Sequence, residues 1–345
     1  MRTIVITGGA GFIGSAFVRM VVSERPDVRI VNIDSLTYAG NVENLAGIDP
    51  SRHLFVKADI CDPEAVMEAI PAGCDAVFNF AAESHVDRSI TSAGEFLRTN
   101  VIGTQVLLDG ARARGVGRFV QISTDEVMGS LPDDGGEYFT EDSILQPNSP
   151  YAASKAAAEF VVRAARETHG VDTVITRCGN NYGPRQFPEK LIPLMIANAQ
   201  NDEPLPVYGD GRNVRDWIYV DDHCRAIWLA YEKGGSGEAY NIGARNEREN
   251  IQVVKTLLDA LGKPHSLIKF VEDRLGHDRR YAIDPTKAET ELGWKPRITW
   301  EEGLSETIRW YRENQTWVDH IRSGDYRDYY DAMYAGRLEN AASGE

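Results

Sequence analysis

The sequence predicts an α/β fold in which helices cover both faces of a doubly wound parallel sheet. Short apolar runs rich in β-branched residues recur through the first half of the chain, and longer helix-like segments lie between several of them. Such runs are typical of strands buried on both faces, and their alternation with helices is typical of βαβ units. A glycine-rich turn directly after the first run is the third observation, because doubly wound sheets commonly carry such a turn there.

Each element follows from its local pattern. We expect strands at residues 3–7, 28–34, 54–57, 76–81, 118–123 and 173–177. We expect helices at residues 12–23, 63–70, 97–115 and 151–169, where longer segments separate the apolar runs. Later in the chain, residues 222–232 and 301–314 also have a helical pattern.

The composition changes after residue 180, where proline and glycine become frequent and the regular segments become short. We therefore predict a first domain at residues 1–180, a smaller C-terminal substrate lobe mainly at 181–315, and a tail at 316–345. Segments near 213–245 are expected to return to the first domain, because residues 240–243 have the pattern of one more core strand. Closely spaced tyrosines in the tail predict a helix that docks on the body, and they are Tyr326, Tyr329, Tyr330 and Tyr334.

Composition excludes several classes of function. The chain has 345 residues, of which 42% are hydrophobic and 26% charged, and this is typical of a soluble globular protein. A formal net charge of -15 disfavours binding to nucleic acid or to an anionic membrane surface. No apolar run is long enough to span a bilayer, and the four cysteines show neither metal-ligand nor disulfide-framework spacing. We expect a cytoplasmic protein with reduced thiols and no metal site.

A dinucleotide site is predicted where the first expected strand meets the first expected helix. Gly8, Gly11 and Gly14 form a GxxGxxG turn, which lets the backbone approach a pyrophosphate beside the helix N-terminus. Asp34 ends the next strand ~20 residues later, where a carboxylate binds the ribose hydroxyls and repels a 2'-phosphate, so NAD is favoured over NADP. The alternatives are an ordinary tight turn and a capping role for Asp34, while Asp59 is either an adenine contact or a turn residue.

Two pairs of side chains carry the predicted chemistry. Tyr151 and Lys155 lie four residues apart on one helix face, where the ammonium is expected to lower the pKa of the phenol. Asp125 and Glu126 are adjacent carboxylates, so one pKa is raised and the pair can provide an acid beside a base. Taken alone, a Tyr–Lys pair at this spacing is more often surface decoration.

The segments GGAGFIG, NFAAES, ISTDEV and YAASK, in this order, resemble the extended short-chain dehydrogenase/reductase family, which implies a Rossmann-type fold. Within that family, AAESHVDRSI, STDEV, NNYGP and GHDRRY resemble the dTDP-glucose 4,6-dehydratases. This resemblance implies a lyase that oxidises C4 of the sugar with bound NAD, eliminates water across C5 and C6, and returns the hydride to C6. The chain departs from the family pattern at Met128, where members usually have tyrosine.

The resemblance also implies the role of each site residue. Thr124 would hydrogen-bond the sugar hydroxyl, Asp125 would act as acid, Glu126 as the base at C5, and Tyr151 with Lys155 as the base at C4. The expected cofactor contacts are Gly8, Gly11, Phe12, Ile13, Gly14, Asp34, Ser35, Leu36, Thr37, Asp59, Ile60, Phe80, Ala81, Ala82, Ser84, Thr99, Tyr151, Lys155 and Asn181. The expected contacts to the nucleotide-sugar substrate are Ser84, Thr124, Asn180, Lys190, Leu191, Pro206, Tyr208, Arg215, Asn250, Arg274, His277 and Tyr281.

Several alternatives stay open. A nucleotide-sugar 4-epimerase would share the fold, NAD and the Tyr–Lys pair, but it has no use for adjacent carboxylates. A non-catalytic NAD-binding scaffold is the third alternative, although such proteins usually lose the tyrosine or the lysine. His85 is either a ring contact or a core hydrogen-bonding group. A homodimer is expected, because family members pair the helices that correspond to residues 97–115 and 151–169.

Overall fold

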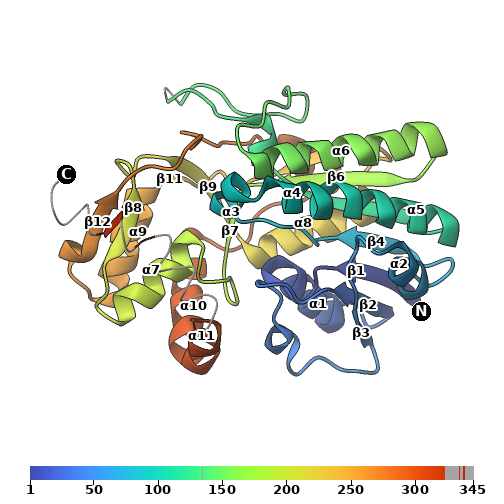
Figure 1. The fold of residues 1–345 in the computed structure, drawn as a ribbon, viewed down its shortest axis with the longest axis horizontal. Coiled ribbons are helices and arrows are strands. Elements are labelled where there is room, and N and C mark those ends of the chain that lie inside the picture. Colours follow the sequence, from blue (N-terminus) through green and yellow to red (C-terminus); the bar gives the residue numbers. More distant parts are fainter. Residues whose placement is uncertain (134, 323–333, 335–336, 339–345) are drawn as a thin grey trace.

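The computed structural model describes residues 1–133, 135–322, 334, 337 and 338 (Figure 1). Its core is a seven-stranded parallel sheet of order β10-β6-β5-β4-β1-β2-β3, which confirms the predicted α/β class. The strands are β1 (Arg2–Thr7), β2 (Val28–Asp34), β3 (His53–Lys57), β4 (Ala76–Asn79), β5 (Arg118–Thr124), β6 (Thr173–Cys178) and β10 (Ala239–Ile242).

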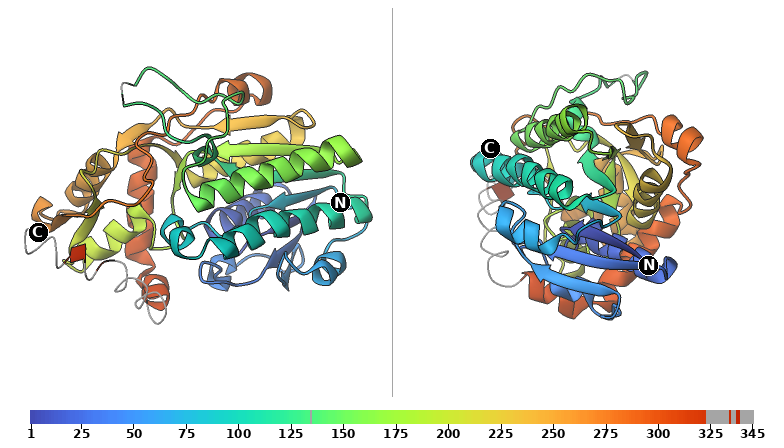
Figure 2. Two further views of the ribbon diagram at one scale, coloured as in Figure 1. Left: turned by 45° about the horizontal axis from the view of Figure 1, so that its top comes forward. Right: turned by 90° about the vertical axis from the view of Figure 1, so that its right-hand side faces the viewer.

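Helices cover both faces of this sheet because successive strand residues point to opposite sides. On one face, Ile4 and Ile6 pack with Phe17 and Trp228 of α1 (Phe12–Glu24) and α8 (Val220–Lys233). On the other face, Val5 packs in a cluster with side chains of α2, α5 and α6. Figures 1 and 2 show α5 and α6 running side by side over this second face. The helices of that face are α2 (Pro63–Ala69), α3 (Val86–Thr91), α4 (Ala93–Phe96), α5 (Thr104–Arg114) and α6 (Pro150–His169).

One predicted helix has an unexpected local form. The segment expected as a single helix at 97–115 begins with a π-helical stretch, Leu97–Gly103, which joins α4 to α5. Asn100 in this stretch is buried, and its amide donates 2.8 Å to Ser154 Oγ of α6 and 3.0 Å to the Glu83 carbonyl oxygen. The wider turn therefore places a polar side chain at the helix interface beside the end of β4.

The second lobe is built from short elements around an aromatic core. Tyr182, Trp217 and Trp300 pack together there, with ring centroids 5.0–6.4 Å apart. Its sheets are β11-β9-β7 and β12-β8. The strands are β7 (Asn180–Tyr182), β8 (Leu205–Tyr208), β9 (Val214–Tyr219), β11 (Glu247–Glu249) and β12 (Ile268–Val271), and the helices are α7 (Leu191–Gln200), α9 (Asn250–Leu261), α10 (Trp300–Glu313) and α11 (Gln315–Arg322). Shorter turns lie at η1 (Val42–Leu45), η3 (Asp125–Met128), η4 (His265–Leu267) and η5 (Ala288–Leu292).

The segments near 213–245 divide between the two lobes. α8 and β10 belong to the large sheet and its helical cover, whereas β9 belongs to the three-stranded sheet of the second lobe. In the tail, Tyr326, Tyr329 and Tyr330 lie outside the described residues, while Tyr334 is buried. Over the described part of the chain, we find no helix that is long and apolar enough to cross a membrane.

Candidate active site

A cavity of about 610 Å³ runs from the glycine turn after β1 to the ends of β4, β5 and β6. It lies where the strand order reverses, since β1 is flanked by β2 on one side and β4 on the other. Crevices at such a reversal are the usual ligand sites of doubly wound sheets. The predicted cofactor residues all line this cavity except Leu36, which follows Asp34 with a positive φ of 55°.

The glycine turn leaves room for a ligand's phosphates. Gly8 has a φ of +71°, and a Cβ on it would lie 2.6 Å from the Ala81 nitrogen. A Cβ on Gly14 would lie 2.2 Å from the Gly8 carbonyl oxygen, so this packing excludes any larger residue. The N-cap of α1, Gly11, provides no side-chain cap, so the first amide groups of the helix remain available to an anion. These features fit a dinucleotide pyrophosphate.

Asp34 has the local capping role and also lines the cavity. Its two carboxylate oxygens accept hydrogen bonds from Ala10 N at 2.9 Å and Leu36 N at 2.8 Å, so it does cap the local turn. Burial raises its pKa, and these two backbone hydrogen bonds act against that rise. Each carboxylate oxygen has a second lone pair, and Asp34 lines the cavity, so it can still accept from ribose hydroxyls.

Asp59 also has a local structural role at the cavity wall. It accepts from Cys61 N at 2.8 Å and from Arg98 Nη2 at 3.2 Å. Arg98 lines the same part of the cavity, as does Thr99. The pair therefore places a cation and an anion beside the expected adenosine end.

The predicted carboxylate pair directly follows β5 and lines the cavity. Thr124 is the last strand residue, and its hydroxyl donates to Asp125 Oδ1 and accepts from Glu126 N, both at 3.3 Å. Asp125 is only 1% exposed, and its Oδ2 has no hydrogen-bond partner among the residues that the structure describes. A buried oxygen without a donor favours the protonated acid, because the proton can then be offered to a ligand.

The surroundings act differently on the pKa values of the two carboxyl groups. Burial, followed by the neighbouring Glu126, raises the pKa of Asp125 well above its usual value. Burial also raises the pKa of Glu126, but Arg215, Lys190 and Arg274 act against that rise. The cations of the second lobe therefore favour ionisation of Glu126, which leaves Asp125 as the protonated member of the pair.

The Tyr151–Lys155 pair occupies one face of α6, but its electrostatics differ from the prediction. Lys155 Nζ donates 2.7 Å to the Ile122 carbonyl oxygen, and burial lowers the pKa of Lys155 to about 8. Burial, followed by Glu126, raises the pKa of Tyr151 well above its usual value, and a hydrogen bond with Thr124 acts against that rise. The expected lowering of the tyrosine pKa is wrong for this arrangement, because desolvation and the neighbouring carboxyl groups raise it.

The expected substrate residues fall into two groups. Ser84, Thr124, Asn180 and Lys190 line the cavity, and Lys190 Nζ donates 2.9 Å to the Ser84 carbonyl oxygen. The others lie outside its lining, in the second lobe, and they are Leu191, Pro206, Tyr208, Arg215, Asn250, Arg274, His277 and Tyr281.

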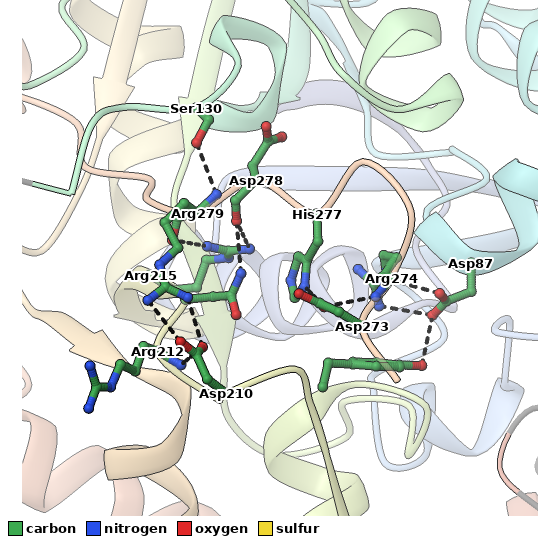
Figure 3. A network of polar contacts seen from close by, with 12 residues as sticks. Asp87, Ser130, Asp210, Arg212, Arg215, Asp273, Arg274, His277, Asp278 and Arg279 are labelled. Carbon is green, nitrogen blue, oxygen red and sulfur yellow. Dashed lines mark hydrogen bonds and ion pairs between the residues drawn. The ribbon is translucent and has the colours of Figure 1, made fainter. Parts of the chain in front are cut away.

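Figure 3 shows the cationic part of this second group. Arg274 binds Asp87 through two hydrogen bonds of 2.9 and 2.8 Å. Arg215 donates to the backbone carbonyl oxygens of Val214 and Asp278, and its guanidinium carbon lies 4.2 Å from the ring centroid of Tyr281. These arginines are held in place by the protein itself, which is what recognition of a diphosphate requires.

Neighbouring residues complete the same network. His277 Nδ1 lies 2.6 Å from Asp273 Oδ1, and burial together with Arg215 and Arg274 lowers the pKa of His277 to about 4. Tyr281 donates 2.6 Å to Asp278. Asn250 begins α9, and its backbone N–H donates a 3.0 Å hydrogen bond to the Asn213 carbonyl oxygen.

The histidine and asparagine that lie between the lobes have core hydrogen bonds. His85 caps α3 by accepting from Arg88 N at 3.4 Å, and its Nε2 lies 3.6 Å from Glu189 Oε2. Asn181 lines the cavity while it donates 3.1 Å to the Gly179 carbonyl oxygen and contacts His223 Nδ1 at 2.9 Å.

Some cavity residues were missed by sequence reasoning. Glu189 is buried, accepts 3.1 Å from the Tyr38 hydroxyl, and has a pKa raised by burial to about 7. Its only sequence signal is its place beside Lys190. Met128, where the family usually has tyrosine, is buried in an apolar cluster and does not line the cavity. The other unpredicted lining residues include Glu83, Glu95, Arg98, Cys178, Gln186 and Phe187.

Comparisons with known proteins show the family to which the chain belongs. The model of a family described as GDP-mannose 4,6 dehydratase matches residues 5–307. The dTDP-glucose 4,6-dehydratase of Xanthomonas campestris pv. campestris (strain B100) is 51% identical and covers 95% of this chain and 98% of that protein. The enzyme of that name from Escherichia coli is 48% identical, with 97% and 99% covered.

Solved structures point the same way. The dTDP-glucose 4,6-dehydratase DesIV from Streptomyces venezuelae, crystallised with NAD bound, superposes with a TM-score of 0.88 at 51% identity, covering 91% of this chain and 98% of that one. A UDP-glucose 4-epimerase from Thermotoga maritima superposes with a TM-score of 0.83 at 32% identity, covering 91% and 99%. The fold is therefore common to elimination and epimerisation, and the side chains must decide between them.

Proposed function

Because this chain belongs to the GDP-mannose 4,6-dehydratase family and, within it, to the dTDP-glucose 4,6-dehydratases, we propose that it converts dTDP-glucose to dTDP-4-keto-6-deoxyglucose with bound NAD. The observation that carries this proposal is the buried Asp125–Glu126 pair, whose two pKa values are shifted by different surroundings. Elimination of water needs one group that removes a proton and another that donates one. The pair provides both at the floor of a dinucleotide-sized cavity.

The glycine turn, the uncapped N-terminus of α1 and Asp34 would hold the cofactor. NAD supplies an acceptor for the hydride of C4 and later the same hydride for C6, and its oxidised ring carries a positive charge. Tyr151 takes the proton of the 4-hydroxyl, while Thr124 hydrogen-bonds the same hydroxyl group. Positive charge from Lys155 and from the oxidised ring is needed to stabilise the phenolate, because burial and Glu126 raise the tyrosine pKa.

Elimination uses the different protonation states of the two carboxyl groups. The C4 ketone acidifies the hydrogen on C5, and ionised Glu126 removes it. Protonated Asp125 donates its proton to the 6-hydroxyl, which leaves as water. When hydride returns to C6, Glu126 gives its proton back to C5 and is reset. The proton that Tyr151 took from the 4-hydroxyl balances the one that Asp125 gave to the departing water, so Tyr151 and Asp125 are restored by net transfer of one proton between them.

The second lobe would bind the nucleotide diphosphate. Lys190, Arg215 and Arg274 supply cations, and these cations also act on Glu126. Substrate binding and the ionisation of the base therefore involve the same positive groups. The remaining proposed contacts are Asn180, Leu191, Pro206, Tyr208, Asn250, His277 and Tyr281.

The epimerase alternative shares everything except the elimination. An epimerase returns the hydride to C4 and needs no proton transfer at C5 or C6. Asp125 and Glu126 would then have no role in the reaction. A non-catalytic scaffold has no use for Tyr151 and Lys155, and here both lie at the cavity. Incubation of the purified protein with dTDP-glucose and no added reductant decides the matter. A product lighter by one water supports the dehydratase, an unchanged mass with conversion to dTDP-galactose supports the epimerase, and no turnover contradicts both.

We also propose a cytoplasmic homodimer. Leu97, Ile102 and Phe160 are 50%, 54% and 58% exposed. Leu97 and Ile102 lie in the π-helical stretch that leads into α5, and Phe160 lies on the neighbouring α6. Exposed apolar side chains grouped on two helices favour burial against a second copy. Light scattering should give twice the 38.3 kDa of one chain, and a mass of one chain would contradict the dimer. The cytoplasmic location is supported by four free cysteines.

A further inference from the structure

Tyr208, the last residue of β8, lies at the centre of the polar network in the second lobe. Its hydroxyl lies 3.5 Å from Asp87 Oδ2, and its ring centroid lies 5.1 Å from the guanidinium carbon of Arg274. The ring of His277 meets it edge-on, with centroids 6.2 Å apart. Tyr208 is therefore packed against the residues proposed to bind the nucleotide diphosphate.

The far end of the chain reaches the same tyrosine. Tyr334 is only 6% exposed, its ring centroid lies 6.2 Å from that of Tyr208, and the two hydroxyl oxygens lie 3.3 Å apart. Arg337 Nη1 donates 3.0 Å to the Tyr208 hydroxyl, and its guanidinium carbon lies 5.2 Å from the Tyr208 ring centroid. Two residues, separated from β8 by more than a hundred positions, thus fix the orientation of one ring.

The two arginines on Tyr208 differ in their charge balance. Arg274 is neutralised by two hydrogen bonds to Asp87. Arg337 forms no ion pair with any carboxylate in the described part of the chain. A guanidinium held beside an aromatic ring without a carboxylate partner keeps its charge available to an anionic ligand.

We propose that Arg337 and Tyr334 complete the nucleotide end of the active site, with Arg337 as a further positioning and specificity residue for a nucleoside diphosphate. Arg337 fixes the Tyr208 hydroxyl by donating to it and adds positive potential beside the diphosphate, while Tyr334 supports the ring. This inference rests on the proposed function, because it assumes that Tyr208 belongs to the nucleotide site. Tyr334 and Arg337 would then belong to the substrate site.

The test is dTDP binding to the full-length protein by calorimetry. Loss of one charge-assisted hydrogen bond and one cation–π contact is expected to raise the Kd for dTDP about tenfold in Arg337→Ala. Arg337→Lys keeps the charge but not the planar fork, so its Kd should lie between those of Arg337→Ala and the wild type. Tyr334→Phe removes only the hydroxyl contact and should raise the Kd about twofold. The Kd for NAD should not change in any variant.

Arg322→Ala is the matched control, because Arg322 pairs with Glu203 at 2.8 Å at the end of α11 and does not contact Tyr208. A dTDP Kd for Arg337→Ala within twofold of wild type would overturn the inference. Equal loss of dTDP and NAD binding would also overturn it, because that result indicates a general structural role. Failure of the proposed function is distinguishable, since the wild-type protein itself would then neither bind dTDP nor turn over dTDP-glucose.

Discussion

The two ends of the active site hold their charged groups in opposite ways. At the end of β5, Asp125 is buried with one carboxylate oxygen lacking a partner, and burial raises the pKa values of Asp125, Glu126 and Tyr151. In the second lobe, Arg274 is bound by Asp87 through two hydrogen bonds, and backbone carbonyl oxygens hold Arg215. The first region keeps groups that can exchange protons. The second region keeps cations whose ionisation does not change and whose geometry is fixed.

This difference teaches where each kind of substitution should act. Proton-transfer groups need a poised pKa, so a change at the end of β5 should act on the chemical step. Fixed cations bind substrate and transition state alike, so a change in the second lobe should act on substrate binding. The two regions communicate, because Arg215, Lys190 and Arg274 also favour the ionised form of Glu126.

The largest expected effect is at the base for C5. Glu126→Gln cannot accept the C5 proton, so kcat for the 4-keto-6-deoxy product should fall by about 10²–10⁴-fold. Oxidation at C4 should persist, and reduced cofactor should therefore accumulate and absorb at its characteristic wavelength. Exchange of the C5 hydrogen with deuterated solvent should stop. Near-normal turnover of this variant would contradict the assignment.

Substitution of an arginine in the second lobe should have a smaller effect, and this effect should fall on substrate binding. Arg274→Ala removes a proposed diphosphate contact and leaves the Asp87 carboxylate buried, so KM for dTDP-glucose should rise about tenfold or more. The kcat should change by only about twofold, since the reacting groups remain. Arg279→Ala is the control, because Arg279 pairs with Asp210 and Asp133 on the surface. A fall in kcat with unchanged KM would remove the distinction between the two regions.

The smallest effect concerns stability and its dependence on pH. The folded pKa of Asp125 is raised above its unfolded value, so the folded state binds the extra proton and this contribution is fully present below the unfolded pKa near 3.8. It is lost as pH rises through the folded pKa. Asp125→Asn mimics the protonated acid and keeps its stability as the pH rises. Its free energy of unfolding should therefore exceed that of the wild type by about 1–2 kcal/mol between pH 5 and pH 8, and by less at lower pH. Urea unfolding at several pH values measures the difference in unfolding free energy between the variant and the wild type. A difference that is the same at every pH would show that Asp125 is not held protonated in the folded state.

The parts of the fold that were predictable are those with a strong local pattern. Buried parallel strands have continuous apolar runs, so β1, β2 and β5 were readable within one or two residues of their observed bounds. The glycines after β1 carry a steric requirement that only glycine meets. The π-helical stretch at Leu97–Gly103 was not predictable, because the apolar pattern of a helix does not distinguish one wide turn.

The site was harder to predict where its properties depend on surroundings. Tyr151 and Lys155 were found by their spacing, but the direction of the tyrosine pKa depends on burial and on Glu126, which sequence does not place. Glu189 is a single acidic residue with no pattern, and only the fold buries it beside Tyr38 and His85. Arg337 donates a hydrogen bond to Tyr208 although the two lie 129 positions apart in the sequence, and no local signal could pair them.

The most direct test of the central claim follows one hydrogen atom from C4. The protein is incubated with dTDP-glucose carrying deuterium at C4, and the product is examined by proton and deuterium NMR. Oxidation, elimination and hydride return within one active site predict deuterium in the C6 methyl group of a 4-keto product. Deuterium that remains at C4 of a hexose of unchanged mass would contradict dehydration and would assign the site to epimerisation.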